Sequence, residues 1–166
     1  MRMQRKYEIR KICSDDAAWI RQIIKNHWGD EFTVVHGDIY YPHKLSGFVA
    51  IDSLDQKIGL VTYSIQKMEC EVVTLNSVRE KMGIGTALMS AVREIAIERK
   101  CKRVWLITTN DNLHAIGFYQ KLGYELVAIH RGMIEQSRQI KPSIPLISSD
   151  GIPLRDEIEL ELPLSK

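Results

Sequence analysis

The fold is decided by residues 75–88, which read Leu75-Asn76-Ser77-Val78-Arg79-Glu80-Lys81-Met82-Gly83-Ile84-Gly85-Thr86-Ala87-Leu88. The β-branched, apolar run before this stretch, residues 72–75, predicts a strand that ends at Asn76-Ser77. After the two glycines, apolar residues recur at three- and four-residue steps, which predicts a helix. They are Ile84, Ala87, Leu88, Ala91, Val92 and Ile95. A strand, a glycine loop and a helix N-terminus in this order can bind a phosphate through free backbone N–H groups, although a tight turn alone would also need both glycines.

Length, composition and charge predict one compact domain over residues 1–166. The chain is 45% hydrophobic and carries a formal net charge of +2, with both signs mixed along it. This mixture argues against nucleic acid as a partner, and no apolar run approaches the roughly 18 residues of a membrane-spanning helix. The three cysteines, Cys13, Cys70 and Cys101, have no metal-ligand spacing. We therefore expect reduced thiols and a cytoplasmic location, with Cys70 and Cys101 in the core.

The segments before the glycine loop predict a strand, a helix and then an antiparallel β-meander. The expected helix begins at a cap formed by Ser14 or Asp15 and ends near Trp28. The expected strands are 7–12, 47–52, 57–66 and 69–75, with a short strand and an irregular loop within 30–46.

The segments after the loop helix, which we expect over about 84–100, complete an α/β pattern with a mixed sheet. A short strand over 104–108 precedes a helix that Asp111 caps and that runs through Leu122. A strand over 124–130 and a short helix over 133–141 follow. Residues 157–162 alternate strictly, which predicts a last strand with its glutamates facing solvent.

A second motif covers residues 112–124, Asn-Leu-His-Ala-Ile-Gly-Phe-Tyr-Gln-Lys-Leu-Gly-Tyr. It resembles the Asn-x-x-Ala-x-x-Phe-Tyr-x-Lys-x-Gly-Tyr/Phe segment of the GNAT superfamily of N-acetyltransferases, and the glycine loop stands at the right distance before it. The resemblance implies the GNAT fold, a mixed, mostly antiparallel sheet flanked by helices. In that fold a central parallel pair, here 69–77 and 103–108, splays to bind acetyl-CoA. Residues 132–166 resemble the C-terminal extension of a bacterial GNAT subfamily whose substrates are largely unassigned.

The resemblance also implies a set of acetyl-CoA-binding residues. The pantetheine arm would pair with the backbone at Leu75 and Ser77, and the Asn112 side chain would bind the arm or simply start a helix. The pyrophosphate would accept hydrogen bonds from the N–H groups of Met82, Gly83, Ile84, Gly85 and Thr86, with the Thr86 hydroxyl as a further donor. Glu80 stands where the superfamily usually has Gln or Arg; we expect it to face solvent, with Arg79 and Lys81 on either side.

Acetyl transfer to an amine requires a general base and a proton for the leaving thiolate. The resemblance assigns the acid to Tyr119, which would otherwise be a core aromatic residue. For the base we favour Glu71 over Glu69, two residues away on the same strand, and a route through water alone remains open. An acidic pocket for a cationic amine could add two more carboxylates, those of Asp38 and Asp111.

The remaining charged residues leave alternatives open. The cations Arg131, Arg138 and Lys141 could instead bind an anionic group of the substrate. We interpret His36 and His114 as structural or surface residues, and no His, Cys or Asp spacing predicts a metal site.

The sequence thus predicts an acetyl-CoA-dependent N-acetyltransferase that acts on a primary amine of a small molecule or a peptide by direct attack. One alternative is a non-catalytic, regulatory CoA-binding module, to which Glu80 points. Another is a protein-interaction domain that works through residues 132–166. A homodimer is compatible with the sequence.

Overall fold

The computed structural model describes residues 6–79 and 81–164, so Glu80 lies outside the described part of the chain. Its main sheet has seven strands in the order β1-β4-β5-β6-β7-β9-β8. Their bounds are Tyr7–Lys11 (β1), Ser46–Asp52 (β4), Lys57–Gln66 (β5), Glu69–Ser77 (β6), Arg103–Thr109 (β7), Glu125–His130 (β8) and Glu157–Pro163 (β9). The β6–β7 pair is parallel and the other five pairings are antiparallel.

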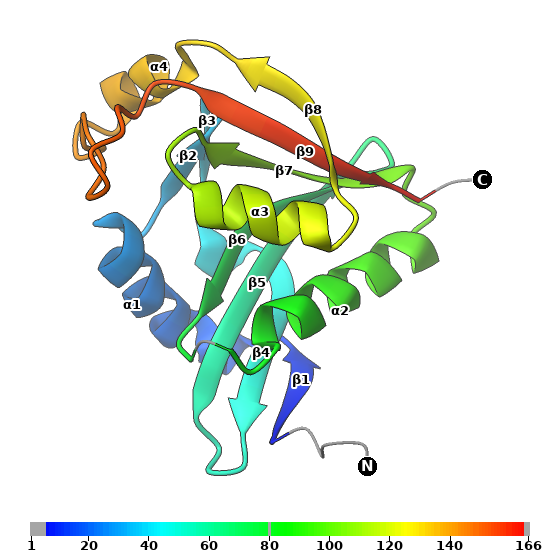
Figure 1. The fold of residues 1–166 in the computed structure, drawn as a ribbon. Helices are drawn as coiled ribbons and strands as arrows, with labels where there is room; N and C mark the ends of the chain where they lie inside the picture. The colour runs from blue at the N-terminus through cyan, green and yellow to red at the C-terminus, as the bar shows by residue number, and fades with distance from the viewer. Residues whose placement is uncertain (1–5, 80, 165–166) are drawn as a thin grey trace.

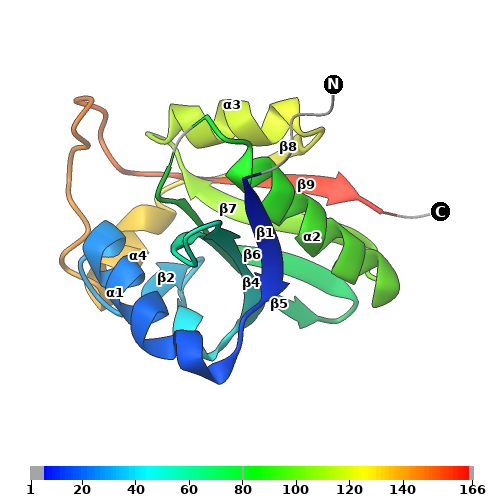
Figure 2. The same cartoon turned by 90° about the horizontal axis from the view of Figure 1, so that it is seen from below.

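Helices cover both faces of this sheet. Figure 2 shows α2 and α3 on one face and α1 and α4 on the other. The helices are Ala17–Trp28 (α1), Ile84–Glu98 (α2), Leu113–Lys121 (α3) and Met133–Ile140 (α4). Within residues 6–79 and 81–164, no helix is long and apolar enough to cross a membrane.

The larger core lies between the sheet and the helices α2 and α3. The face of α2 that the sequence predicts is buried, as are the side chains that β6 turns toward it, Cys70 and Val72. Gly59 on β5 makes this close packing possible, because a Cβ there would lie 2.6 Å from Ile84. Each large apolar side chain buried in this way stabilises the fold by roughly 1.5–3 kcal/mol. The core therefore fixes α2, and with it the glycine loop, against the sheet.

The start of α1 differs from the expectation that Ser14 or Asp15 caps it. Those residues belong to a 3₁₀ turn, Ser14–Asp16, which precedes the helix. The carboxylate of Asp16 caps this turn, not α1: it is fully buried and accepts a hydrogen bond from the Cys13 N–H. Among the described residues no side chain caps α1 itself. Arg10 donates two hydrogen bonds to the same carboxylate and holds the pKa of Asp16 well below its usual range. The buried charge is tolerated because it is paired, which a sequence pattern does not show.

Two further local expectations were wrong. In residues 30–46 the expected short strand is present, but the rest is not an irregular loop: a second short strand completes a β-hairpin, β2 (Thr33–Val35) and β3 (Asp38–Tyr40), and a 3₁₀ turn follows. The cap of α3 is Asn112, whose side-chain oxygen accepts from the Ala115 N–H, whereas Asp111 accepts a hydrogen bond from the Thr109 hydroxyl.

The last strand, β9, pairs with both β7 and β8, so it is an interior strand. The expectation that its glutamates face solvent was therefore wrong. Glu157 is 2% exposed, and Glu159 and Glu161 form ion pairs with Arg103. The alternation that the sequence shows is real, but its polar face is covered by other parts of the chain. Residues of the C-terminal extension are thus part of the sheet.

Candidate active site

The strands β6 and β7 form a wedge at the centre of the sheet. They pair in parallel from Glu69 and Arg103 as far as Val72 and Leu106, and the pairing then stops although both strands continue. Figure 1 shows the two strands running apart beyond their shared start, with α3 across the opening.

A β-bulge explains why the pairing stops where it does. Val72 is opposite Tyr63 on β5, but Thr74 is opposite Thr62, so Val73 is the extra residue. A bulge bends its strand, and this one lies directly after the last β6–β7 pair. The splayed part of β6, with Leu75 and Ser77, consequently has no partner strand on the β7 side among the described residues. Its backbone is free to pair with an extended ligand.

The glycine loop leads from this splayed strand into α2. Gly83 is the N-cap of α2 and has a φ of +71°, a conformation that favours glycine. The first bond of the helix runs from the Ala87 N–H to the Gly83 carbonyl, so the N–H groups of Ile84, Gly85 and Thr86 precede it. Among the residues that the structure describes, no side chain caps the helix. These features fit an anion at the end of the wedge, since free N–H groups and the helix dipole both favour negative charge.

The side chain of Arg79, the basic residue before the glycine loop, binds other parts of the protein. Arg79 lies 2.7 Å from a carboxylate oxygen of Asp52 and 3.1 Å from Gln56, so its guanidinium anchors the loop to the β4–β5 turn. The Ser77 hydroxyl donates to the Arg79 carbonyl at 2.6 Å. The expected flanking role of Arg79 beside a phosphate therefore gives way to a structural one.

Tyr119 lies on α3, which spans the wedge. Its ring is buried among the rings of Phe118 and Tyr124, with centroids 5.1 and 5.7 Å away. Burial raises the pKa of Tyr119, so its hydroxyl keeps its proton at neutral pH. At the N-terminal end of the same helix, Asn112 has the helix-starting role that the sequence left open. Its side-chain NH₂ group remains a donor.

Glu71 is a buried carboxylate on the opposite face of β6 from Cys70 and Val72, one residue before the wedge opens. Its Oε2 accepts a hydrogen bond from the Tyr40 hydroxyl at 2.7 Å. Burial raises the pKa of Glu71, and the hydrogen bond from Tyr40 opposes that effect. A carboxylate whose pKa is raised in this way suits proton transfer.

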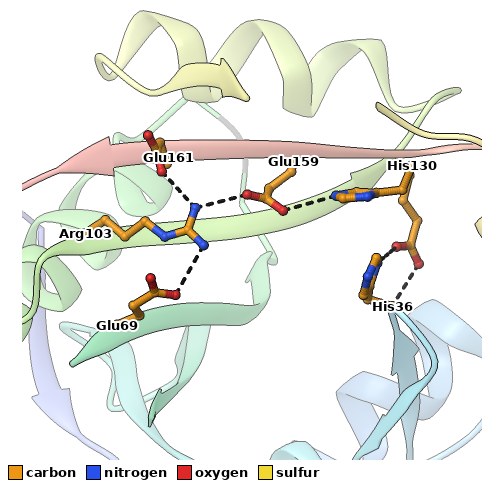
Figure 3. A network of polar contacts seen from close by, with 7 residues as sticks. His36, Glu69, Arg103, His130, Glu159 and Glu161 are labelled. Carbon is orange, nitrogen blue, oxygen red and sulfur yellow. Dashed lines mark hydrogen bonds and ion pairs between the residues drawn. The ribbon is translucent and has the colours of Figure 1, made fainter. Parts of the chain in front are cut away.

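Glu69 shares the face of Glu71 but has different partners. Arg103 lies 3.2 Å from Glu69 and also binds Glu159 and Glu161, at 3.0 and 2.7 Å. Figure 3 shows this guanidinium, from β7, between carboxylates of β6 and β9, the two strands on either side of β7. The structure therefore places Glu69 in an ion-pair network.

Several residues near Glu71 were missed by the sequence analysis. They are Tyr40, Glu157, Glu159, Glu161 and Arg103. The alternating glutamates of β9 were visible in the sequence, but only their place between β7 and β8 brings them to the face of Glu71. No sequence pattern indicated that Tyr40 contacts Glu71, because the two residues are 31 positions apart in the sequence.

The other charged candidates separate into two groups. Asp38 is exposed on β3 and acts electrostatically on Glu71, whereas Asp111 lies in the β7–α3 connection. Arg138 donates to the carbonyls of Ile144, Pro145 and Leu154, and the buried Lys141 donates to that of Phe32. Arg138 thus braces the C-terminal extension and Lys141 ties it to the residue before β2, which argues against their binding an anionic substrate. In the described ranges, no group of His, Cys, Asp and Glu side chains could hold a metal ion.

Known proteins share this arrangement. The chain matches the acetyltransferase (GNAT) family over residues 3–124. It belongs to the GNAT acetyltransferase family. The Bacillus subtilis protein YxbD, which is uncharacterized, is 41% identical over 141 residues that cover 85% of this chain and 89% of YxbD. This GNAT chain therefore has a relative of almost its full length.

Two solved structures share the fold of this GNAT protein. A GNAT acetyltransferase from Elizabethkingia anophelis with acetyl-CoA bound has a TM-score of 0.70 at 16% identity, over 97% of this chain and 100% of that one. A variant of the spermidine N-acetyltransferase SpeG from Vibrio cholerae also has a TM-score of 0.70, at 13% identity, over 96% and 95% of the two chains. At these identities the likeness shows the fold alone.

Proposed function

We propose that this protein transfers the acetyl group of acetyl-CoA to a primary amine by direct attack, with Glu71 as general base and Tyr119 as general acid. The observation that carries the proposal is the wedge between β6 and β7, which has the N-terminus of α2, with its free N–H groups, at one end. A buried carboxylate and a protonated tyrosine lie on the two sides of the sheet next to it.

Each group has one proton to move. Bound acetyl-CoA supplies a thioester carbonyl. Glu71 takes a proton from the substrate ammonium, which frees the nitrogen lone pair to form the new C–N bond. After the attack the nitrogen still carries two protons, and it gives one of them to solvent. As the C–S bond breaks, Tyr119 gives its proton to the thiolate, and solvent then returns a proton to Tyr119. Glu69 is a weaker candidate for the base, because its carboxylate pairs with Arg103 and lies farther from the opening.

The charge around Glu71 favours a cationic acceptor. Five glutamates of β6 and β9 share this face of the sheet, and Arg103 is the guanidinium that pairs with three of them. The five are Glu69, Glu71, Glu157, Glu159 and Glu161. We therefore expect amines with a second positive charge to be better acceptors than zwitterionic amino acids.

A CoA-release assay tests this function. Acetyl-CoA would be incubated with polyamines, aminoglycosides, amino acids, peptide N-termini and peptide lysines, and the free thiol measured. Release that depends on one class of amine supports the proposal. Acetyl-CoA binding without release for any amine would favour the non-catalytic CoA-binding module instead. Absence of binding would leave the interaction-domain alternative.

The glycine loop gives a binding prediction. Gly83→Asp is expected to raise the Kd for acetyl-CoA about a hundredfold or more, because the new carboxylate would face the pyrophosphate. Isothermal titration calorimetry measures the change. Gly151→Asp is the matched control, since Gly151 also has a positive φ, +79°, and open space around its Cβ position. An unchanged Kd in a folded Gly83→Asp protein would contradict the assignment of the loop.

A further inference from the structure

The β2–β3 hairpin touches the carboxylate-bearing face of the main sheet at two points. At one, the Tyr40 hydroxyl donates to Oε2 of Glu71 at 2.7 Å. At the other, the backbone N–H of His36 donates to Oε1 of Glu157 at 3.0 Å, and Nδ1 of His36 lies 3.1 Å from Oε2. Figure 3 shows His36 close to His130, whose Nε2 lies 3.1 Å from Glu159. The hairpin is thus attached to β6 and to β9 through buried carboxylates.

These attachments decide where the hairpin lies. Its strands have three residues each, and a hairpin of this size has little stability of its own. The turn is tight, because both central residues, His36 and Gly37, have positive φ, +51° and +83°. This turn aims the His36 N–H at Glu157, which is 2% exposed and therefore a fixed point of the sheet.

We propose that Tyr40 is a positioning residue for Glu71 and that the contact between His36 and Glu157 holds Tyr40 in that place. The proposal deepens the proposed function and rests on it for the role of Glu71 as a base. It adds a part to the machinery that lies outside the two sequence motifs: a hairpin between α1 and β4 that orients the base.

The geometry assigns different tasks to the two oxygens of Glu71. Within residues 6–79 and 81–164 the Tyr40 hydroxyl is the donor to Oε2, and Oε1 is left for the ammonium of the acceptor. The hydrogen bond also favours the ionised carboxylate, which burial disfavours. Other charged groups that face Glu71 come from the hairpin and from β9. They are Asp38 and Glu157, which raise its pKa, and His36, which lowers it.

The first test measures the base directly. In protein with ¹³C-labelled glutamate, NMR gives the pKa of Glu71, and the acidic limb of the pH profile of kcat/KM gives the pKa of the catalytic base. Tyr40→Phe removes the donor and keeps the ring, so we expect both values to rise by about one pH unit. The limb therefore moves to higher pH, since the base holds its proton more tightly.

Tyr41→Phe is the matched control, because Tyr41 is the next residue along the chain, is exposed and packs against Phe32 and Lys44. Neither the NMR value nor the limb should move in that variant. An unchanged Glu71 pKa in Tyr40→Phe, or a kinetic limb that does not follow the NMR titration, would overturn the assignment of Tyr40.

The second test addresses His36. His36→Ala should raise the pKa of Glu71 in wild-type protein and raise it less in the Tyr40→Phe background, because residues that act through one contact are not additive. Fully additive shifts would show that His36 acts on Glu71 independently, and the holding role would fail.

Failure of the proposed function would look different from failure of this inference. A wild-type protein that acetylates no amine would overturn the role of Glu71 as a base. The NMR titration does not depend on activity, so it still tests whether Tyr40 and His36 control the Glu71 carboxylate.

Discussion

Replacing Glu71 by glutamine is expected to lower kcat/KM for the amine about 10²- to 10⁴-fold near neutral pH, which is the usual range for a lost general base. Glutamine keeps the shape of the side chain and can still accept the hydrogen bond from Tyr40, so the fold should persist. The amide cannot take a proton from the substrate ammonium. The loss should therefore appear in turnover, while the Kd for acetyl-CoA stays close to that of the wild type.

The pH dependence of this variant follows from the direction of the pKa shift. Burial raises the pKa of Glu71, and the base works only when ionised, so wild-type activity should rise with pH through that raised value. In Glu71→Gln this limb disappears. A limb at higher pH should replace it, because free amine forms there without help. Initial rates measured from acidic to alkaline pH would show the displacement.

Glu69→Gln is the control for this experiment. Glu69 lies on the same face of β6, but its side chain is 38% exposed and paired with Arg103, so the variant should keep a wild-type pH profile. If Glu69→Gln loses the limb and Glu71→Gln keeps it, the wrong carboxylate has been assigned. If both variants keep it, water and the ionisation of the amine account for the deprotonation.

Tyr119→Phe is expected to lower kcat about ten- to a thousandfold with little change in the Kd for acetyl-CoA. Phenylalanine preserves the packing against Phe118 and Tyr124 and removes only the proton donor. The thiolate must then leave without a proton from the protein. Because burial raises the pKa of Tyr119, the wild type should not lose activity through this group until strongly alkaline pH. Stopped-flow or steady-state assays of CoA release give kcat.

The neighbouring tyrosine provides a matched control. Tyr124 is also buried, and its hydroxyl has no hydrogen-bond partner in the described part of the chain. Removing that hydroxyl costs no hydrogen bond, so Tyr124→Phe should fold at least as stably as the wild type and keep its kcat. Equal losses in Tyr119→Phe and Tyr124→Phe would mean that the hydroxyls matter only through packing, and would argue against Tyr119 as the acid.

Local sequence patterns predicted many elements of the fold. The apolar spacing from Ile84 to Ile95 predicted α2, and α2 ends within two residues of the expected position, at Glu98. The β-meander before the glycine loop and the short helix over 133–141 were also confirmed. These elements could be predicted because apolar residues recur along each of them with a period of about two residues in a strand or 3.6 residues in a helix.

Some of the errors arose because a side chain has a partner far away in the sequence. Ser14, Asp15 and Asp111 are all acceptable caps by residue type, yet Asp16 caps the 3₁₀ turn before α1 and Asn112 caps α3. For Asp16 the reason is tertiary, because Arg10 and Lys57 from two strands neutralise its buried carboxylate. Residue type alone does not distinguish such neighbours.

By itself the sequence determined the family and the glycine loop, because these depend on short motifs and on hydrophobic periodicity, and the resemblance to the family then implied the parallel strand pair. Only the tertiary structure decided where the pair separates. The bulge at Val73 inserts one residue, after which Leu75 packs with the same core as Cys70 and Val72. Only the tertiary structure inserted β9 between β7 and β8, which turned glutamates expected in solvent into the surroundings of Glu71. Strand order depends on which surfaces can be buried together over the whole chain, and no single segment encodes it.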